Sequence, residues 1–188
     1  MDFTKEKQDI LNKEDKSIKK EIDFQIKPLI DLLNSLDSYY TTSSCSGRIS
    51  LLEKKSDKKI DTSWLYCSHD QVEFSVIKKE LEKIQQDEVW FRFEPAILHV
   101  CCKTIEHAQK LIDIAKEIGF KRTGIQATRK KIMVEINSSE IIYTLIANKN
   151  NIIIDDAYLQ VLIDQANKKM QSNIARIDKL NHNIKSNL

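Results

Sequence analysis

The chain has 188 residues, of which 41% are hydrophobic and 31% are charged, and its formal net charge is +2 at pH 7. This length suits one domain over residues 1–188 with a buried core, and so small a net charge does not by itself mark a nucleic-acid binder. No apolar run approaches the roughly 20 residues that span a bilayer, and the charged residues 1–20 lack the apolar centre of a signal peptide. We therefore expect a cytoplasmic protein with no membrane partner.

Cysteine and glycine usage excludes several classes of site. The four cysteines, Cys45, Cys67, Cys101 and Cys102, are irregularly spaced and form no C-x-x-C pair, which indicates thiols of a reducing compartment rather than a disulfide framework. Only three glycines occur, and neither a G-x-G-x-x-G sequence nor a P-loop is present. Rossmann-type dinucleotide and methyltransferase sites need such glycines, so those classes are excluded.

The first predicted element is a helix within residues 24–36, whose apolar residues recur at helical spacing and whose start is placed by Pro28. The following run of small hydroxyl residues, TTSSCS at 41–46, is typical of a turn. Two strands should come next, at residues 47–55 and 62–68, joined by a lysine-rich turn.

An amphipathic helix is expected within residues 70–86, with Asp70 as its N-cap. Two strands follow it, at residues 88–94 (EVWFRFE) and 96–102 (AILHVCC). Pro95 separates these strands, since proline cannot donate a hydrogen bond to the ladder.

A second amphipathic helix should begin after Thr104 and end at Gly119, which are the residue types preferred at the two helix caps. Three further strands lie within residues 121–148, and one long helix covers about residues 155–185. Connections of hairpin length predict an α+β fold: a mixed or antiparallel, non-Rossmann sheet with covering helices and a long C-terminal helix. Parallel crossovers across the two middle helices stay possible.

Basic residues gather in two stretches. These are Lys54, Lys55, Lys58 and Lys59 in the first, and Lys121, Arg122, Arg129, Lys130 and Lys131 in the second. Such clusters are usually solvated surface, and a footprint for phosphate groups is the alternative.

The sequence TTSSCSGRIS, residues 41–50, is the first candidate site. Hydroxyl residues often form plain turns, because their side chains bond nearby backbone. Here Gly47 and Arg48 favour a ligand. Consecutive small residues let backbone N–H groups converge on an anion, and an arginine adds a bidentate fork for carboxylate or phosphate.

Two of the four histidines lie where they could act as bases. His69 follows the strand at 62–68, and His99 faces away from its apolar neighbours Leu98 and Val100. Histidine is suited to proton transfer near neutral pH. The residues alone therefore predict an anion site with nearby histidines, and they leave the reaction open.

The same histidines could join Cys45, Cys67 or Cys101 in a zinc site, but the spacing matches no known ligand pattern. We expect no metal. A nucleophile made of Cys45 and a histidine stays open, because one such pair proves little without geometry.

Five blocks resemble, in order and spacing, the third wybutosine-synthesis protein family of archaea and eukaryotes, over about residues 20–180. The blocks are TTSSCSGRIS (41–50), SWL…H (63–69), EPAILHV (94–100), AQKLIDIAKEIGFKRTGI (108–125) and LIDQANKKMQSNIARI (162–177). That family methylates N-4 of the tricyclic 4-demethylwyosine derivative at position 37 of tRNA(Phe) and takes the methyl group from S-adenosylmethionine. The resemblance implies a tRNA N-methyltransferase of wybutosine biosynthesis, with a compact mixed-sheet fold and the tRNA(Phe) anticodon stem-loop as partner.

Site roles follow from the resemblance together with the residue types. The residues expected to bind S-adenosyl-L-methionine are Ser43, Ser44, Cys45, Ser46, Gly47 and Arg48. Those expected to be catalytic are His69, His99 and Glu94. Those expected to bind the substrate are Trp64, Lys54, Lys55, Arg122, Thr123, Gly124 and Asn167. The family more often has serine at position 123, and threonine keeps the hydroxyl. Trp64 could equally be a core residue. A non-catalytic RNA-binding module and a Cys45-dependent enzyme are the alternatives.

Overall fold

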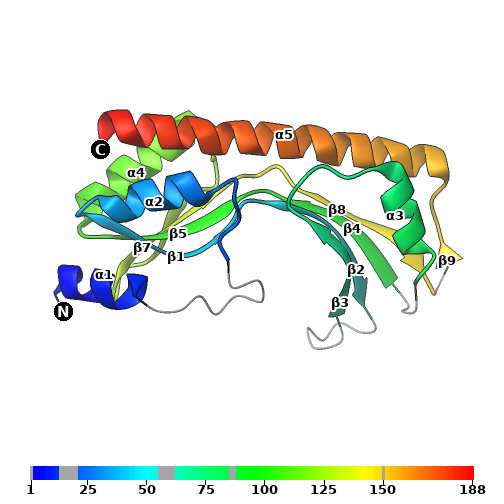
Figure 1. Ribbon diagram of the computed structural model, residues 1–188, viewed down its shortest axis with the longest axis horizontal. Coiled ribbons are helices and arrows are strands. Elements are labelled where there is room, and N and C mark those ends of the chain that lie inside the picture. Colours follow the sequence, from blue (N-terminus) through cyan, green and yellow to red (C-terminus); the bar gives the residue numbers. More distant parts are fainter. Residues whose placement is uncertain (1, 13–20, 55–61, 85–87, 150) are drawn as a thin grey trace. The chain divides into compact units, whose positions relative to one another are not determined.

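The protein is described by a computed structural model that covers residues 2–12, 21–54, 62–84, 88–149 and 151–188. Contacts divide the chain into two units (Figure 1). Unit 1 comprises Met1–Ser46, Ala96–Ser139 and Ile174–Leu188, and unit 2 comprises Gly47–Pro95 and Glu140–Asn173. Each unit contains one antiparallel sheet. The prediction of one domain over residues 1–188 stays a prediction.

Unit 1 has a four-stranded sheet in the order β1-β5-β7-β6. Its strands are β1 (Tyr39–Cys45), β5 (Ile97–Cys102), β6 (Gly124–Ala127) and β7 (Ile132–Asn137). Its helices are α1 (Phe3–Leu11), α2 (Lys27–Ser35), α4 (Ile105–Glu117) and the end of α5 (Asp156–Asn187). Figure 1 shows α2, α4 and α5 on one side of this sheet and α1 on the other.

The core of unit 1 lies between the sheet and α2, α4 and α5. Alternate strand residues such as Leu98 and Val134 are buried there with Leu33 and Leu180 from the helices. On the opposite face α1 covers Tyr40, whose ring centroid is 5.3 Å from that of Phe3. Strand alternation thus sends apolar residues to the core face, while the opposite face carries Tyr40 under α1 and polar residues such as Ser43 and His99.

Helix caps in unit 1 follow the sequence. The Thr104 hydroxyl accepts a hydrogen bond from the His107 backbone N–H, which caps the start of α4. Gly119, just past the end of this helix, has φ of 109°. Only glycine adopts that conformation without strain. Pro28 lies in the first turn of α2. These predicted boundaries are confirmed.

Unit 2 has a five-stranded sheet in the order β3-β2-β4-β8-β9. Its strands are β2 (Arg48–Lys54), β3 (Thr62–Ser68), β4 (Glu88–Glu94), β8 (Ile142–Asn148) and β9 (Asn151–Ile152). The helix α3 (Phe74–Leu81) and residues 156–173 of α5 lie on one side of this sheet (Figure 1). Ile49, Leu51, Phe91 and Phe93 are fully buried, because alternate residues of β2 and β4 face the interior.

The predicted α+β class with antiparallel strands and a long C-terminal helix is confirmed. Three details were wrong. Residues 41–45 are strand rather than turn, because β1 pairs along its length with β5, and threonine suits a strand. The N-cap of α3 is Glu73, because Asp70 instead forms a local turn in which its N–H donates to the Ser68 hydroxyl. The described strands form two sheets instead of one, and none of their pairs is parallel.

Two further points complete the comparison with the sequence. The helix α1 was not expected, since its apolar spacing is weak and none of its residues is buried. No helix in the described ranges has both the length and the apolar character needed to cross a membrane.

Candidate functional site

A row of four residues crosses the whole sheet of unit 1. Ser43 on β1 is the direct partner of His99 on β5, His99 of Glu135 on β7, and Glu135 of Gly124 on β6. Directly paired residues share one face of a sheet, so all four lie on the face opposite the apolar core. The side chains of His99 and Glu135 are 30% and 20% exposed, so solvent and ligands can reach them.

Hydrogen bonds join three members of this row. The Ser43 hydroxyl lies 2.8 Å from Nδ1 of His99, and Nε2 of His99 lies 3.1 Å from Oε2 of Glu135. Because a carboxylate only accepts, Nε2 carries the hydrogen and donates it to Glu135. In the neutral form of the ring, Nδ1 then accepts the Ser43 hydrogen. The Asn137 amide donates to Oε1 of Glu135 at 3.3 Å, which fixes the carboxylate.

The row contains three predicted site residues, Ser43, His99 and Gly124, and one that the sequence analysis missed. The missed residue, Glu135, is a charged side chain between Val134 and Ile136 in a strand with apolar alternation. A carboxylate on the polar side of such a strand was the available signal, although it does not identify a partner.

Space is open at the Gly124 end of the row. A Cβ at Gly124 would meet no atom within 4 Å, so the position next to Glu135 is not filled by protein. The preceding Thr123 is 3% exposed, and its hydroxyl has no hydrogen-bond partner among the described residues. Arg122 is exposed and is held by its backbone N–H, which donates to the Asn137 carbonyl at 3.1 Å. This hydroxyl is buried, so what a ligand would meet at this end of the row is the open position at Gly124.

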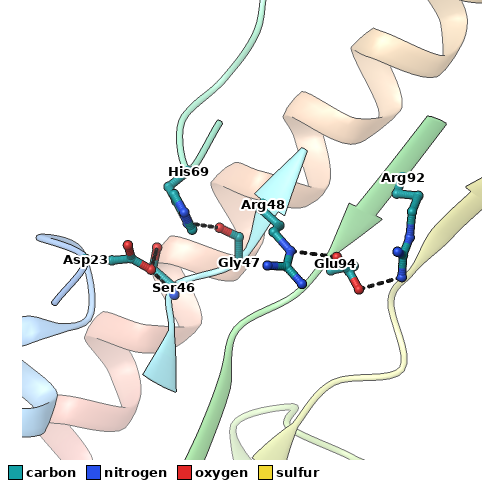
Figure 2. Close-up of polar contacts among 7 residues, drawn as sticks. All are labelled: Asp23, Ser46, Gly47, Arg48, His69, Arg92 and Glu94. Carbon is teal, nitrogen blue, oxygen red and sulfur yellow. Dashed lines mark hydrogen bonds and ion pairs between the residues drawn. The ribbon is translucent and has the colours of Figure 1, made fainter. Parts of the chain in front are cut away.

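The expected cofactor block, residues 43–48, has a carboxylate beside it in unit 1. The backbone N–H and the hydroxyl of Ser46 both donate to Oδ2 of Asp23, at 2.8 and 3.2 Å (Figure 2). Ser44 and Cys45 belong to β1, so their backbone takes part in the sheet rather than in a loop. The Ser46 donors are thus used by Asp23, and the block presents a carboxylate beside it; its role in cofactor binding stays a prediction.

His69 lies in unit 2, where Nδ1 is 2.8 Å from the Gly47 carbonyl oxygen (Figure 2). A carbonyl accepts, so Nδ1 of His69 donates in this bond. Gly47 has φ of 100°, which lets the chain turn at this point without strain. The catalytic role expected for His69 stays a prediction.

Two arginines of unit 2 share one carboxylate. Arg48 Nε donates to Oε2 of Glu94 and an Nη2 hydrogen of Arg92 donates to Oε1, both at 2.7 Å (Figure 2). The Arg48 guanidinium also lies 4.7 Å from the ring centroid of Trp64, which is 45% exposed and therefore no core residue. Glu94 thus orients two cations, and its expected catalytic role stays a prediction.

The remaining expected substrate residues have separate settings. Lys54 Nζ donates to the Tyr143 hydroxyl at 3.0 Å in unit 2, and Lys55 lies outside the described residues. Asn167 on α5 binds backbone: its Oδ1 accepts from the Val72 N–H at 2.9 Å and its amide donates to the Val72 carbonyl at 2.8 Å. These two hydrogen bonds attach the Val72 backbone to α5, which is a structural role. We call them the Asn167 clamp.

Comparison with known proteins identifies the family. The family model described as Methyltransferase TYW3 matches residues 5–186. The chain belongs to the TYW3 methyltransferase family. A Danio rerio tRNA wybutosine-synthesizing protein 3 homolog is 36% identical over 99% of this chain and 76% of its own length. The TYW3 relative from Pyrococcus furiosus, a tRNA(Phe) 7-((3-amino-3-carboxypropyl)-4-demethylwyosine(37)-N(4))-methyltransferase 1, is 36% identical over 88% of this chain and 86% of its own length.

Solved structures share the TYW3 fold. A Pyrococcus horikoshii protein has a TM-score of 0.90 at 34% identity and covers 97% of this chain and 95% of its own. An Aeropyrum pernix protein, at 23% identity and a TM-score of 0.78 over 88% of this chain and 99% of its own, shows the fold alone. The resemblance given by the sequence motifs is confirmed, and so is the methyltransferase class.

Proposed function

We propose that this chain methylates N-4 of the tricyclic 4-demethylwyosine derivative at position 37 of tRNA(Phe), in the cytoplasm and without a metal. The observation that carries the proposal is the match to the TYW3 family model across residues 5–186. A relative named for this reaction also aligns with 88% of this chain. The row of Ser43, His99 and Glu135 supports it, because it supplies a base on an accessible face.

The residues of unit 1 fit S-adenosylmethionine as the co-substrate. When bound, it supplies the methyl group and leaves as a neutral thioether. The Asp23 carboxylate beside residues 43–46 is complementary to the positive charges of this molecule, and the Ser46 hydroxyl is held next to it. The open position at Gly124 leaves space for a ligand beside Glu135. We assign cofactor binding to Asp23 with residues 43–46 of unit 1.

The chain's own residues would remove the proton that the acceptor nitrogen loses on methylation. Ser43 Oγ accepts that proton as it passes its own hydrogen to Nδ1 of His99. The ring then carries a positive charge, which the carboxylate of Glu135 stabilises through Nε2. General base catalysis of this kind contributes roughly 10²- to 10⁴-fold. We assign catalysis to His99 and positioning to Glu135, and we assign Glu94 and His69 to holding Arg48 and Gly47.

The test is methyl transfer by the purified protein. It is incubated with methyl-labelled S-adenosylmethionine and tRNA(Phe) that carries the tricycle without the N-4 methyl group, and the RNA is digested to nucleosides. We expect the label in the tricyclic nucleoside, and equal activity after treatment with a chelator. Tight binding of tRNA without binding of S-adenosylmethionine would favour the RNA-binding module. Loss of transfer in Cys45→Ala with cofactor binding retained would favour the Cys45-dependent enzyme.

A further inference from the structure

Aromatic and cationic side chains gather on one face of the unit 2 sheet. Trp64 on β3 and Trp90 on β4 are both direct partners of Leu52 on β2, and Tyr143 on β8 is the partner of Arg92. Paired residues share a face, so these rings lie opposite the buried face of the sheet. We call six side chains the aromatic-cationic face: Arg48, Lys54, Trp64, Trp90, Arg92 and Tyr143.

The rings and cations of this face contact one another. Trp90 and Tyr143 are stacked, with centroids 4.5 Å apart and planes inclined by 13°. Lys54 Nζ lies 5.3 Å from the Trp90 ring, and the Arg92 guanidinium lies 4.9 Å from the Tyr143 ring. These contacts fix the planes of the rings, which are pre-organised for a flat ligand.

Resting on the proposed function, we propose that the aromatic-cationic face binds single-stranded nucleotides of the anticodon loop. Bases stack on the rings of Trp64 and Tyr143, and phosphates contact the neighbouring cations. Trp64 and Tyr143 are 45% and 47% exposed, so each ring presents apolar area to solvent. Base stacking on such rings accepts any base, because every base has a π-face.

Single-stranded RNA fits this face better than a duplex does. A duplex hides the faces of its bases and offers only backbone and groove edges to a protein, whereas loop nucleotides can be splayed out and stacked. The electrostatic contribution to RNA binding by this face should be small. Glu94 lies between Arg48 and Arg92, and Glu88 accepts from the Trp90 indole N–H. These two carboxylates offset the three cations of the face, which are the two arginines and Lys54. With at most three phosphates neutralised, the log–log salt slope should be no steeper than about −2.

The test uses the full chain and two RNA probes. One is a stem-loop with the tRNA(Phe) anticodon-loop sequence, and the other is a blunt duplex with the same stem. Trp64 and Trp90 are the only tryptophans in the sequence, so tryptophan fluorescence, excited at a wavelength that tyrosine does not absorb, reports on this face alone. We expect the stem-loop to quench this fluorescence and the duplex to leave it nearly unchanged. Fluorescence anisotropy of labelled RNA gives the affinity.

Three variants separate stacking from other effects. Tyr143→Ala should weaken binding of the stem-loop about ten-fold, as loss of one stacked base does, and Tyr143→Phe should retain it. Tyr158→Ala is the matched control, since Tyr158 is 46% exposed in the same unit but lies on α5. Circular dichroism checks that each variant is folded.

Equal affinity of Tyr143→Ala and Tyr158→Ala for the stem-loop would overturn the inference, and so would equal quenching by the duplex. The failure of the proposed function is distinct from these results. If the wild-type protein binds the loop on this face and transfers no methyl group, the aromatic-cationic face stands and the proposed reaction falls. If it transfers methyl and Tyr143→Ala binds and turns over normally, only the face is refuted.

Discussion

Replacing Asn167 by alanine should destabilise unit 2 rather than remove a substrate contact. The Asn167 side chain satisfies both backbone groups of Val72, at 2.9 and 2.8 Å, across 95 residues of sequence. Val72 is 5% exposed, so water cannot fully replace these bonds. A buried backbone group left without a partner costs about 1–3 kcal/mol. Asn167→Ala leaves two such groups in a half-buried position, so we expect the free energy of unfolding to fall by about 2–4 kcal/mol.

The assay is urea unfolding followed by tryptophan fluorescence, which reports on the unit that contains the clamp, because Trp64 and Trp90 both belong to it. With a slope of about 2 kcal/mol per molar urea, the midpoint should fall by about 1–2 M. Gln165→Ala is the control, since Gln165 is exposed on the same helix. An Asn167→Ala variant with the wild-type midpoint and weakened tRNA binding would refute the clamp and restore the substrate role.

Three further outcomes follow from the geometry. Arg48→Lys should weaken tRNA binding roughly ten-fold in a filter assay. Lysine keeps the charge but lacks the planar guanidinium that binds Glu94 and lies over the Trp64 ring. Wild-type affinity in this variant would mean that only the charge of Arg48 matters. At neutral pH a thiol reagent should modify the exposed Cys67 first and reach Cys101 and Cys102 only on unfolding. Both of these thiols are buried, and burial raises their pKa, that of Cys102 to about 12. Equal modification rates for these three cysteines would contradict this. Since the pKa of Cys102 is higher in the folded state, its contribution to stability is present below about pH 9 and is lost as the pH rises toward 12. The midpoint of urea unfolding, followed here by circular dichroism because Cys102 belongs to unit 1 and both tryptophans to unit 2, should therefore fall from pH 8 to pH 10.

Local sequence patterns predicted those helices and strands whose conformation is determined by their own residues. The strand Glu88–Glu94 follows from its apolar, aromatic-rich sequence ahead of Pro95, and the start of α4 follows from the capping threonine. The hydroxyl run at 41–45 was misread because its partner strand decides its conformation. A run of threonine and serine suits a turn in isolation and a strand once β5 supplies the ladder.

The site was predicted as residue types and not as an arrangement. Ser43 was expected to bind the cofactor and His99 to be catalytic. The two residues are 56 positions apart in the sequence, and Glu135 is 36 positions beyond His99. Only the register between β1, β5 and β7 makes them neighbours, and sequence periodicity carries no information on register between distant strands. Asp23 was missed because it lies in a loop before α2, and its contact with Ser46, 23 residues away, leaves no local pattern in the sequence.

The central claim is that His99 of the unit 1 row removes the proton during methyl transfer. The most direct measurement is the single-turnover rate of methyl transfer with saturating S-adenosylmethionine and tRNA, for His99→Gln and for His182→Gln, an exposed histidine on α5. We predict a fall of roughly 10²-fold or more for His99→Gln, with cofactor and tRNA affinities unchanged, and no change for His182→Gln. A His99→Gln variant that turns over at the wild-type rate would contradict the claim.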